Sequence, residues 1–151
     1  MKYKGGNFIM NNKAQKFKDY LDEKEIKVFE IEELSDEQET VAFRSRITIS
    51  GQNLPTAVFI DNSDYSMVRV QIAPNALTAE NSADVLKFAN DETAKYKPFK
   101  LFFNDNGDLL LDFCIDANDE IFSGEKVYSV FDIIINYLEN NYRNIMKEIW
   151  K

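Results

Sequence analysis

The side chains in this sequence that are best suited to chemistry gather around its single cysteine. Asp112 and Asp116 lie two residues on either side of Cys114, a spacing that offers a thiol and two carboxylates for nucleophilic or acid–base catalysis. Alternation along a strand, however, predicts that both carboxylates face solvent, where no dry and shaped site forms around them. A reactive thiol needs a cationic neighbour, and the sequence places none beside Cys114. We therefore expect a small structural residue at position 114 and no catalytic residues.

Several classes of enzyme and metal site are excluded by what the sequence lacks. The 151 residues contain no histidine, which removes Ser-His-Asp triads, Cys-His dyads and HExxH zinc sites. One cysteine cannot form an intramolecular disulfide or a four-cysteine zinc site, and five scattered glycines match no nucleotide-binding motif. The Asn/Asp-rich turn at 104–108 fails as an EF-hand loop, because Phe102 and Phe113 fall where carboxylates are needed. We expect no metal, no cofactor and no enzymatic activity.

The composition is that of an acidic chain with enough apolar residues for a core. Lys and Arg number 18 against 26 Asp and Glu, and the net charge of −8 argues against a nucleic-acid partner bound through its phosphates. Hydrophobic residues make up 44%, but no run approaches the roughly 18 apolar residues of a membrane span. We expect a cytoplasmic protein with no membrane partner, a flexible leader over residues 1–10 and a single domain over residues 11–151. An alternative is that the native chain starts at Met10 and that the leader is an upstream extension.

Hydrophobic periodicity divides the chain into helices and strands. Spacing of 3.6 residues predicts helices, and alternation or β-branched runs predict strands. The predicted elements are a helix at 13–24, strands at 26–34, 41–49, 56–60 and 65–72, a helix from residue 82, a hairpin over 99–116 and a helix at 125–150. Strands joined by tight turns favour an antiparallel sheet with helices on one face. We therefore predict an α+β two-layer sandwich with the element order α-β4-α-β2-α.

Polar residues predict where these helices and turns begin. Asn11 or Asn12 is the expected N-cap of the first helix, Ser82 of the second and Ser123 of the third. A turn is expected over Gly51–Pro55. The second helix is expected to bury a single apolar side, formed by Val85, Leu86, Phe88 and Ala89.

The hairpin is the most specific local signal. Asp105-Asn106-Gly107 fits a three-residue loop that closes with glycine in the left-handed conformation. This loop fixes one register, in which apolar residues face each other on one side and opposite charges meet on the other. The predicted pairs are Phe99–Phe113, Lys100–Asp112, Leu101–Leu111, Phe102–Leu110 and Phe103–Leu109.

Motifs between Asp84 and Ile149 follow an order that is known from one protein family. They are the helix end Lys87-Phe88-Ala89-Asn90, the segment Pro98-Phe99-Lys100, the turn Asn104–Asp108 before Leu109-Leu110-Leu111, and the long helix from near Val127. With this order, residues 13–150 resemble the YbjN family, whose fold is similar to that of the type III secretion chaperones. The resemblance implies a small, dimeric bacterial protein that binds another polypeptide. Family members are described as sensory transduction regulators without an established reaction, so the resemblance supplies no catalytic residues.

One face of the predicted sheet carries more large side chains than a solvent-exposed face needs. Arginine and aromatic residues are typical of interfaces, so this face is predicted to bind a partner polypeptide or a second copy of the chain. The alternative is that the leader, the acidic loop or a helix covers it. The candidate residues are Arg44, Arg46, Tyr65, Met67, Arg69, Phe102 and Leu110.

These observations favour a non-catalytic adaptor or chaperone-like regulator that dimerises. It would use either this face or the long C-terminal helix to bind another polypeptide. The alternative function is a small-ligand sensor with a pocket between helices and sheet. A small carboxylate-dependent enzyme is the least favoured hypothesis.

Overall fold

The computed structural model describes residues 2–4 and 10–151, which form one seven-stranded sheet and three helices. Apart from a short first strand, the elements follow the predicted order α-β4-α-β2-α, and the α+β class is confirmed. In chain order they are β1 (Lys2–Lys4), α1 (Asn12–Glu23), β2 (Glu30–Glu33), β3 (Val41–Ile49), β4 (Gln52–Ile60), β5 (Tyr65–Ala73), α2 (Ser82–Lys95), β6 (Phe99–Phe103), β7 (Leu109–Asp116) and α3 (Gly124–Ile149).

The strand order across the sheet is β1-β2-β3-β4-β5-β7-β6. Every neighbouring pair is antiparallel except β1 and β2, which run parallel. β1 is not predicted from the sequence, and it lies within the expected leader. The leader residues 1 and 5–9 lie outside the described residues.

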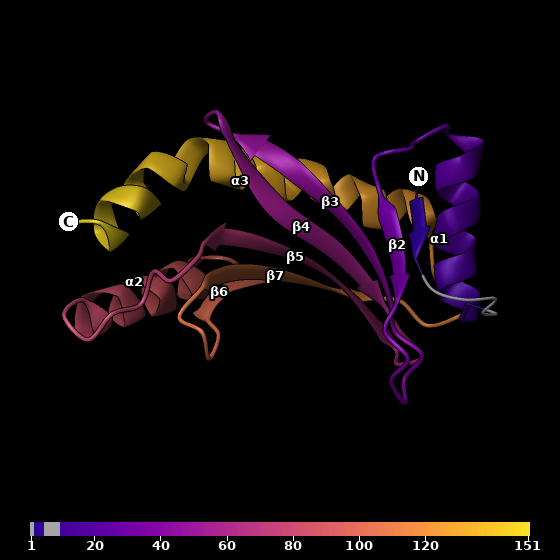
Figure 1. The fold of residues 1–151 in the computed structure, drawn as a ribbon, viewed down its shortest axis with the longest axis horizontal. Helices are drawn as coiled ribbons and strands as arrows, with labels where there is room; N and C mark the ends of the chain where they lie inside the picture. The colour runs from indigo at the N-terminus through magenta and orange to yellow at the C-terminus, as the bar shows by residue number, and fades with distance from the viewer. Residues whose placement is uncertain (1, 5–9) are drawn as a thin grey trace.

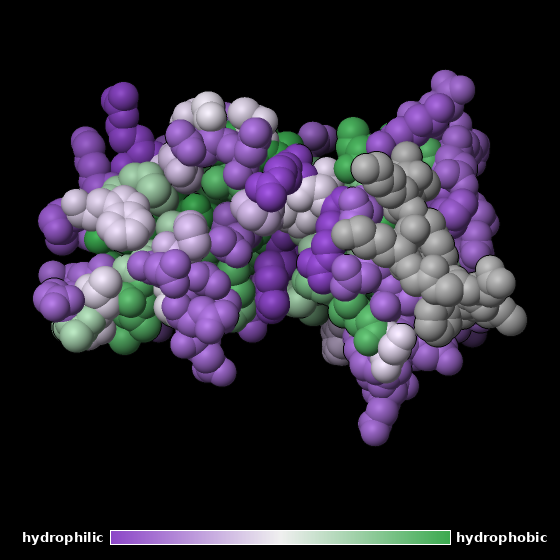
Figure 2. All heavy atoms as spheres, in the orientation of Figure 1, coloured by the Kyte–Doolittle hydropathy of each residue, from purple (hydrophilic) through white to green (hydrophobic). Residues whose placement is uncertain are grey.

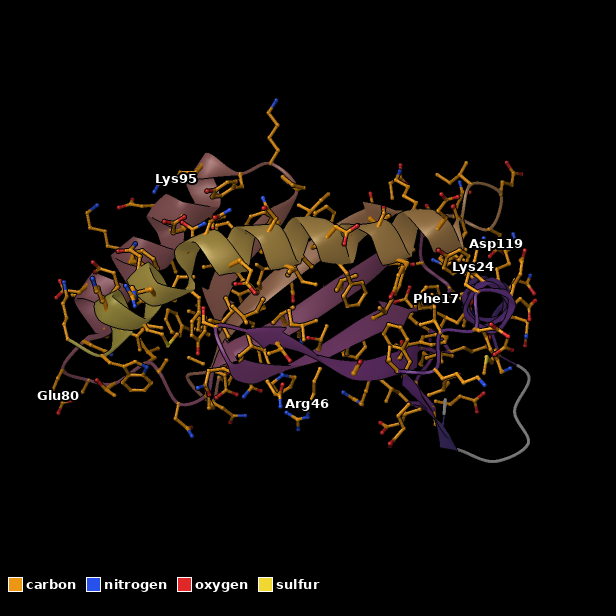
Figure 3. The ribbon with its side chains drawn as sticks, turned by 90° about the horizontal axis from the view of Figure 1, so that it is seen from above. Phe17, Lys24, Arg46, Glu80, Lys95 and Asp119 are labelled. Carbon is orange, nitrogen blue, oxygen red and sulfur yellow. The ribbon has the colours of Figure 1, made fainter. Side chains whose placement is uncertain are left out.

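The helices form a layer on one face of the sheet. α3 runs along the sheet, with α1 at the β2 end and α2 at the β6 end (Figure 1). Phe17 of α1 joins the two layers, because its ring meets Phe43 of β3 edge-on at 4.8 Å between centroids (Figure 3). Phe29 lies between Phe17 and Phe131 of α3, at 5.9 Å from each. Each fully buried aromatic side chain contributes about 1.5–3 kcal/mol of transfer free energy, so this cluster is a main stabiliser of the fold.

The face of the molecule seen in Figure 1 is mostly polar. In the orientation of Figure 1, hydrophilic residues cover most of the surface and hydrophobic atoms show between them in smaller areas (Figure 2). Among the described residues, no helix is long and apolar enough to cross a membrane.

The predicted hairpin is confirmed in every pair. β6 and β7 pair Phe99 with Phe113, and the register continues to the turn without a shift. The Asn104 N–H donates to the Asp108 carbonyl at 3.1 Å, and Gly107 takes φ +78°. Side chains larger than hydrogen are strained in that backbone conformation, which explains why the turn sequence could fix the register.

Two expectations about α2 are wrong. The N-cap is Asn81 and not Ser82, which is the first helical residue. The Asn81 side chain instead donates to the Ala76 carbonyl at 2.8 Å and to the Ile149 carbonyl at 3.3 Å, which holds the start of α2 against the end of α3. Leu86 is 49% exposed, because the buried side of α2 is formed by Val85, Ala89 and Glu92.

The turn expected over Gly51–Pro55 is shorter than predicted. β4 already begins at Gln52, and Ser50 and Gly51 alone make the turn with positive φ values of 50° and 79°. Pro55 pairs with Arg46 of β3, whereas pairing of β4 with β5 begins only at Thr56. A residue without an N–H is tolerated there because no second ladder requires one.

The caps of the other helices agree with the sequence. Asn11 accepts a hydrogen bond from the Ala14 N–H at 2.8 Å, and Ser123 accepts one from the Lys126 N–H at 3.2 Å. Gly124 follows directly, where an added Cβ would lie only 2.6 Å from the Tyr20 Cβ. This close approach fixes how α3 starts against α1.

Candidate functional site

The outer face is the side of the sheet turned away from α3. Arg46 projects from this side in Figure 3, opposite the helix layer. All seven candidate residues belong to the outer face by strand alternation and register. Their partner-binding role is a prediction that the fold does not test.

One row of paired residues crosses the outer face from β2 to β6. We call it the charged row, and it consists of Glu30, Arg44, Ala57, Arg69, Asp112 and Lys100, each paired with the next across neighbouring strands. Negative and positive side chains alternate along the row except at Ala57, which separates two arginines. Paired residues on adjacent strands lie about 5 Å apart, so Arg44 and Arg69 start from backbone positions about 10 Å apart.

The best-defined contact in the charged row joins Arg69 to Asp112. The Arg69 Nε and Nη2 donate to the two Asp112 carboxylate oxygens at 2.7 and 2.9 Å. Asp112 is only 4% exposed, so the expectation that solvent surrounds it is wrong. The hydrogen bonds to Asp112 raise the pKa of Arg69 above its ordinary value. Two parallel hydrogen bonds to a carboxylate hold the guanidinium in one orientation and also balance its charge.

Aromatic rings flank the arginines of the charged row. Phe59 lies between two guanidinium groups, at 5.8 Å from the Arg44 Cζ and 5.7 Å from the Arg69 Cζ. Phe102 lies 5.6 Å from the Arg69 Cζ and 5.0 Å from the Lys100 Nζ. Cations above ring faces at these distances attract by about 0.5–1 kcal/mol each at exposed sites. The rings therefore hold the cations upright over the sheet and still leave them accessible.

A groove of about 680 Å³ lies over β3, β4 and β5 on the outer face. Its lining includes Ala57 of the charged row and the two arginines paired with it, Arg44 and Arg69. Its lining contains three arginines and one glutamate, although the whole chain carries a net charge of −8. The lining residues are Val28, Glu30, Arg44, Ser45, Arg46, Pro55, Thr56, Ala57, Phe59, Arg69, Gln71 and Leu110.

The arginines of the groove differ in how far they are neutralised. Arg69 donates from two of its three guanidinium nitrogens to Asp112, and Arg44 donates to Glu32 over a longer distance of 3.4 Å. Arg46 has no ion-pair or hydrogen-bond partner among the described residues. The groove thus presents donors that its own acidic residues do not satisfy.

The structure brings four of the seven candidate residues together and spreads the other three. Arg44, Arg46, Arg69 and Leu110 line the groove. Phe102 contacts Arg69 beside it, Met67 pairs with Phe59, and Tyr65 lies further along β5, where 57% of it is exposed. Leu110 was expected to be exposed, which is wrong: it pairs with Gln71 and Phe102 and is 4% exposed.

Two residues of the site were missed in the sequence. Phe59 lies between the buried residues Val58 and Ile60, so the alternation used for the other strands would have placed it on the outer face. Ala57 gives no such signal, because its methyl side chain carries no charge and no hydrogen-bonding group. It belongs to the site only because it is paired with Arg44 on one side and Arg69 on the other.

Two cavities of the described residues lie at the periphery of the fold. The groove lies on the helix-free side, and a smaller cavity of about 220 Å³ lies near the start of α1, lined by Asn11, Glu33 and Asp36 among others. Between the layers lie the apolar side chains of the core, including Leu109, Ile134 and Leu138. Within the described residues, no group of three or more His, Cys, Asp or Glu side chains is placed to hold a metal ion. Cys114 is exposed on β7, on the outer face opposite Met67.

Comparison with known proteins finds likeness in fold. No family model matches the chain, and no curated protein matches it. A chain in the crystal structure of the ExsC–ExsE complex matches with a TM-score of 0.55 and 9% identity, over 89% of this chain and 96% of that one. A chain in the crystal structure of the Yersinia pestis type III secretion chaperone SycH in complex with a stable fragment of YscM2 matches with a TM-score of 0.46 and 14% identity, over 83% of this chain and 95% of that one. At these identities the comparison concerns the fold alone, and the match at a TM-score of 0.55 supports the expected fold.

Proposed function

We propose that this protein is a non-catalytic, chaperone-like adaptor that binds a segment of another polypeptide on its outer face. The groove beside the charged row is the observation that carries the proposal. It combines three arginines, of which Arg46 has no partner among the described residues, with apolar surface from Val28 and Phe59, the mixture that protein interfaces favour. A cleft of this size is large enough for several side chains of a bound segment.

The fold comparison supports the same class of function. The ExsC chain that matches this fold was solved in complex with a second protein, ExsE. Binding a polypeptide needs no catalytic residues, which agrees with the expectation that this chain is not an enzyme. Membership of the YbjN family, a cytoplasmic location and a homodimer are further parts of the proposal, and each rests on the sequence analysis.

Affinity capture from a native lysate with surface variants tests the proposed function. Tyr65→Asp and Met67→Asp change the outer face at positions whose side chains are exposed or half-buried, and Ile133→Asp makes the matched change on α3, where Ile133 is 47% exposed. We expect a captured polypeptide to be retained by wild type and Ile133→Asp and lost from the two outer-face variants. Loss with Ile133→Asp alone would assign binding to α3, and equal retention by all three variants would remove the outer face from the proposal.

Oligomeric state is measured separately. Size-exclusion chromatography with light scattering on the wild-type chain is expected to give the mass of a dimer. A monomer at all concentrations would remove the homodimer and leave the adaptor function to the capture experiment.

A further inference from the structure

Ala57 interrupts the charged row at the one place where alternation calls for a negative charge. The order along the row is Glu30, Arg44, Ala57, Arg69, Asp112 and Lys100, so an acidic group above Ala57 would complete a sequence of alternating signs over six strands. Opposite charges on paired strands stabilise each other, whereas like charges repel. Asp112 of β7 binds Arg69 and Glu32 of β2 contacts Arg44, both from strands on the side away from Ala57, so the position between the two arginines is the one without an acidic group.

The space above Ala57 is open to such a group. Ala57 lines the groove, and its methyl group is too short to fill the gap between the two arginine side chains. Both guanidinium groups contact the Phe59 ring, and Asp112 fixes Arg69 with two hydrogen bonds, so Arg69 is already positioned before a ligand binds. Donors fixed in advance lose little side-chain entropy when an anion binds between them.

The remaining surroundings define the rest of the ligand. Arg46 is on the same strand as Arg44, two residues away, and adds to the groove wall a cation that has no partner among the described residues. Apolar surface from Phe59 and from the exposed Val28 borders the cations. Segments that carry carboxylates next to apolar side chains match this pattern, whereas a segment rich in Lys or Arg would place like charges together.

We propose that the groove binds an acidic segment of the partner polypeptide, and that one Asp or Glu carboxylate of this segment occupies the space above Ala57 between Arg44 and Arg69. This inference rests on the proposed function and specifies the chemistry of its partner. The arginines select the partner by charge, and Phe59 and Val28 contribute apolar contact area.

The first test places the carboxylate within the chain itself. Ala57→Glu supplies an acid at the missing position, and Ala57→Gln is the matched neutral control of the same size. We expect the melting temperature of Ala57→Glu to exceed that of Ala57→Gln by about 2–4 °C at low salt, the shift that about 1 kcal/mol produces in a chain of this length. Arg44→Gln in both backgrounds should abolish that difference. An equal melting temperature for the two variants would overturn the site.

The second test uses peptides. Two fluorescein-labelled nine-residue probes have the same alternating design, one with Glu and Leu and the other with Gln and Leu, and their binding to wild-type protein is followed by fluorescence anisotropy. We expect the Glu peptide to bind about tenfold more tightly at low salt, and this preference to shrink as salt screens the charges. Ala57→Glu should remove the preference, because its own carboxylate occupies the space.

The outcomes separate this inference from the proposed function. Equal affinity for the Glu and Gln peptides, both weakened by Met67→Asp, would overturn the acidic selectivity and leave outer-face binding intact. Absence of binding by either peptide would overturn the inference whatever the melting temperatures show, while the capture experiment would still decide the proposed function. A preference for Glu that Ala57→Glu does not change would place the acidic contact elsewhere and also overturn it.

Discussion

The Thr93 hydroxyl bridges both backbone groups of Leu101. It lies 2.9 Å from the Leu101 nitrogen, from which it accepts, and 3.1 Å from the Leu101 carbonyl oxygen, to which it donates. Leu101 is the middle residue of β6, the edge strand of the sheet, so these groups would otherwise point away from the sheet without a partner. α2 thereby blocks the edge at which another strand could pair. Strand pairing is thus blocked at Leu101 on the β6 edge of the sheet, whereas the outer face stays accessible to the proposed partner.

Removing the Thr93 hydroxyl should expose this edge. Thr93→Val keeps the shape of the side chain and leaves both Leu101 backbone groups unpaired, so we expect a loss of about 1–3 kcal/mol in the free energy of unfolding. Urea denaturation measures the loss, and light scattering should show more self-association through the opened edge. Thr93→Ser keeps the hydroxyl and is expected to stay close to wild type on both counts. Equal behaviour of Val and Ser at this position would show that the hydroxyl does not protect the edge.

Arg69 and Asp112 should be energetically coupled. Because Asp112 is 4% exposed, Arg69→Gln leaves a buried carboxylate without its main partner and should be clearly destabilising. The double variant Arg69→Gln/Asp112→Asn replaces the ion pair with two neutral amides and should recover part of the loss. A double-mutant cycle is expected to give about 0.5–3 kcal/mol of coupling, less than for a fully buried pair because Arg69 is 36% exposed.

The exposed helix pair Lys87–Asp91 is the control for this cycle. Its side chains are 76% and 51% exposed, so neutralising them should change stability little. Additive losses for Arg69 and Asp112, similar to those of the control pair, would show that the charged row contributes no more than an ordinary surface ion pair.

Tyr137 should make the protein less stable in alkali. Its hydroxyl lies 3.2 Å from the Glu92 carboxylate, and burial together with that negative charge raises the pKa of Tyr137 above its ordinary value of 10.0. The folded state therefore keeps a proton that the unfolded state loses, so the free energy of unfolding contributed by this group falls as pH rises above about 10, by at most about 1.4 kcal/mol per pH unit.

Tyr137→Phe isolates this effect. The variant should be less stable at neutral pH, where it lacks the hydrogen bond to Glu92, but its stability should fall less steeply above pH 10 than that of wild type. Tyr65→Phe, at an exposed position, is the control and should leave the pH dependence unchanged. Chemical denaturation between pH 8 and pH 11 measures all three proteins. Parallel curves for wild type and Tyr137→Phe would contradict the assignment.

Gly124 should not tolerate a side chain. A Cβ at this position would lie 2.6 Å from the Tyr20 Cβ and 2.8 Å from its Cγ, so Gly124→Ala must push α3 away from α1. We expect a loss of about 1–3 kcal/mol, typical of overpacking, in a thermal or urea unfolding experiment. Tyr20→Ala removes the ring but keeps the Cβ, so it relieves only part of the clash, and the double variant should be somewhat less destabilising than the sum of the two single changes. A Gly124→Ala variant as stable as wild type would rule out the close approach of α1 and α3 as a constraint.

The parts of the fold that the sequence predicts are those that local chemistry controls. The β6–β7 register follows from the left-handed Gly107, and the N-caps Asn11 and Ser123 follow from their own side chains. Asn81 shows the limit of this reasoning. Its side chain is bonded to the Ile149 carbonyl, 68 residues away, so the start of α2 depends on a contact that no local pattern contains.

The sequence predicts which face of the sheet carries the site, but not how the residues on that face are arranged. Alternation assigns Arg44 and Arg69 to the same side of their strands, but it does not reveal which residues of other strands lie beside them. β7 is inserted between β5 and β6, and this insertion brings Asp112 to Arg69. The gap at Ala57 becomes visible only when the order of all six strands in the charged row is known.

The long α3 helix also has a consequence for how the chain is made. Every strand whose inner side it covers precedes it in the sequence, so the ribosome releases the whole sheet before the helix that completes the core. Until residues 124–149 emerge, Phe43, Val68 and Leu111 have no cover from this helix and present a continuous apolar surface during synthesis. Ribosome-bound intermediates of this protein are therefore exposed to aggregation, and chaperones that recognise nascent chains should engage it just before the last helix appears.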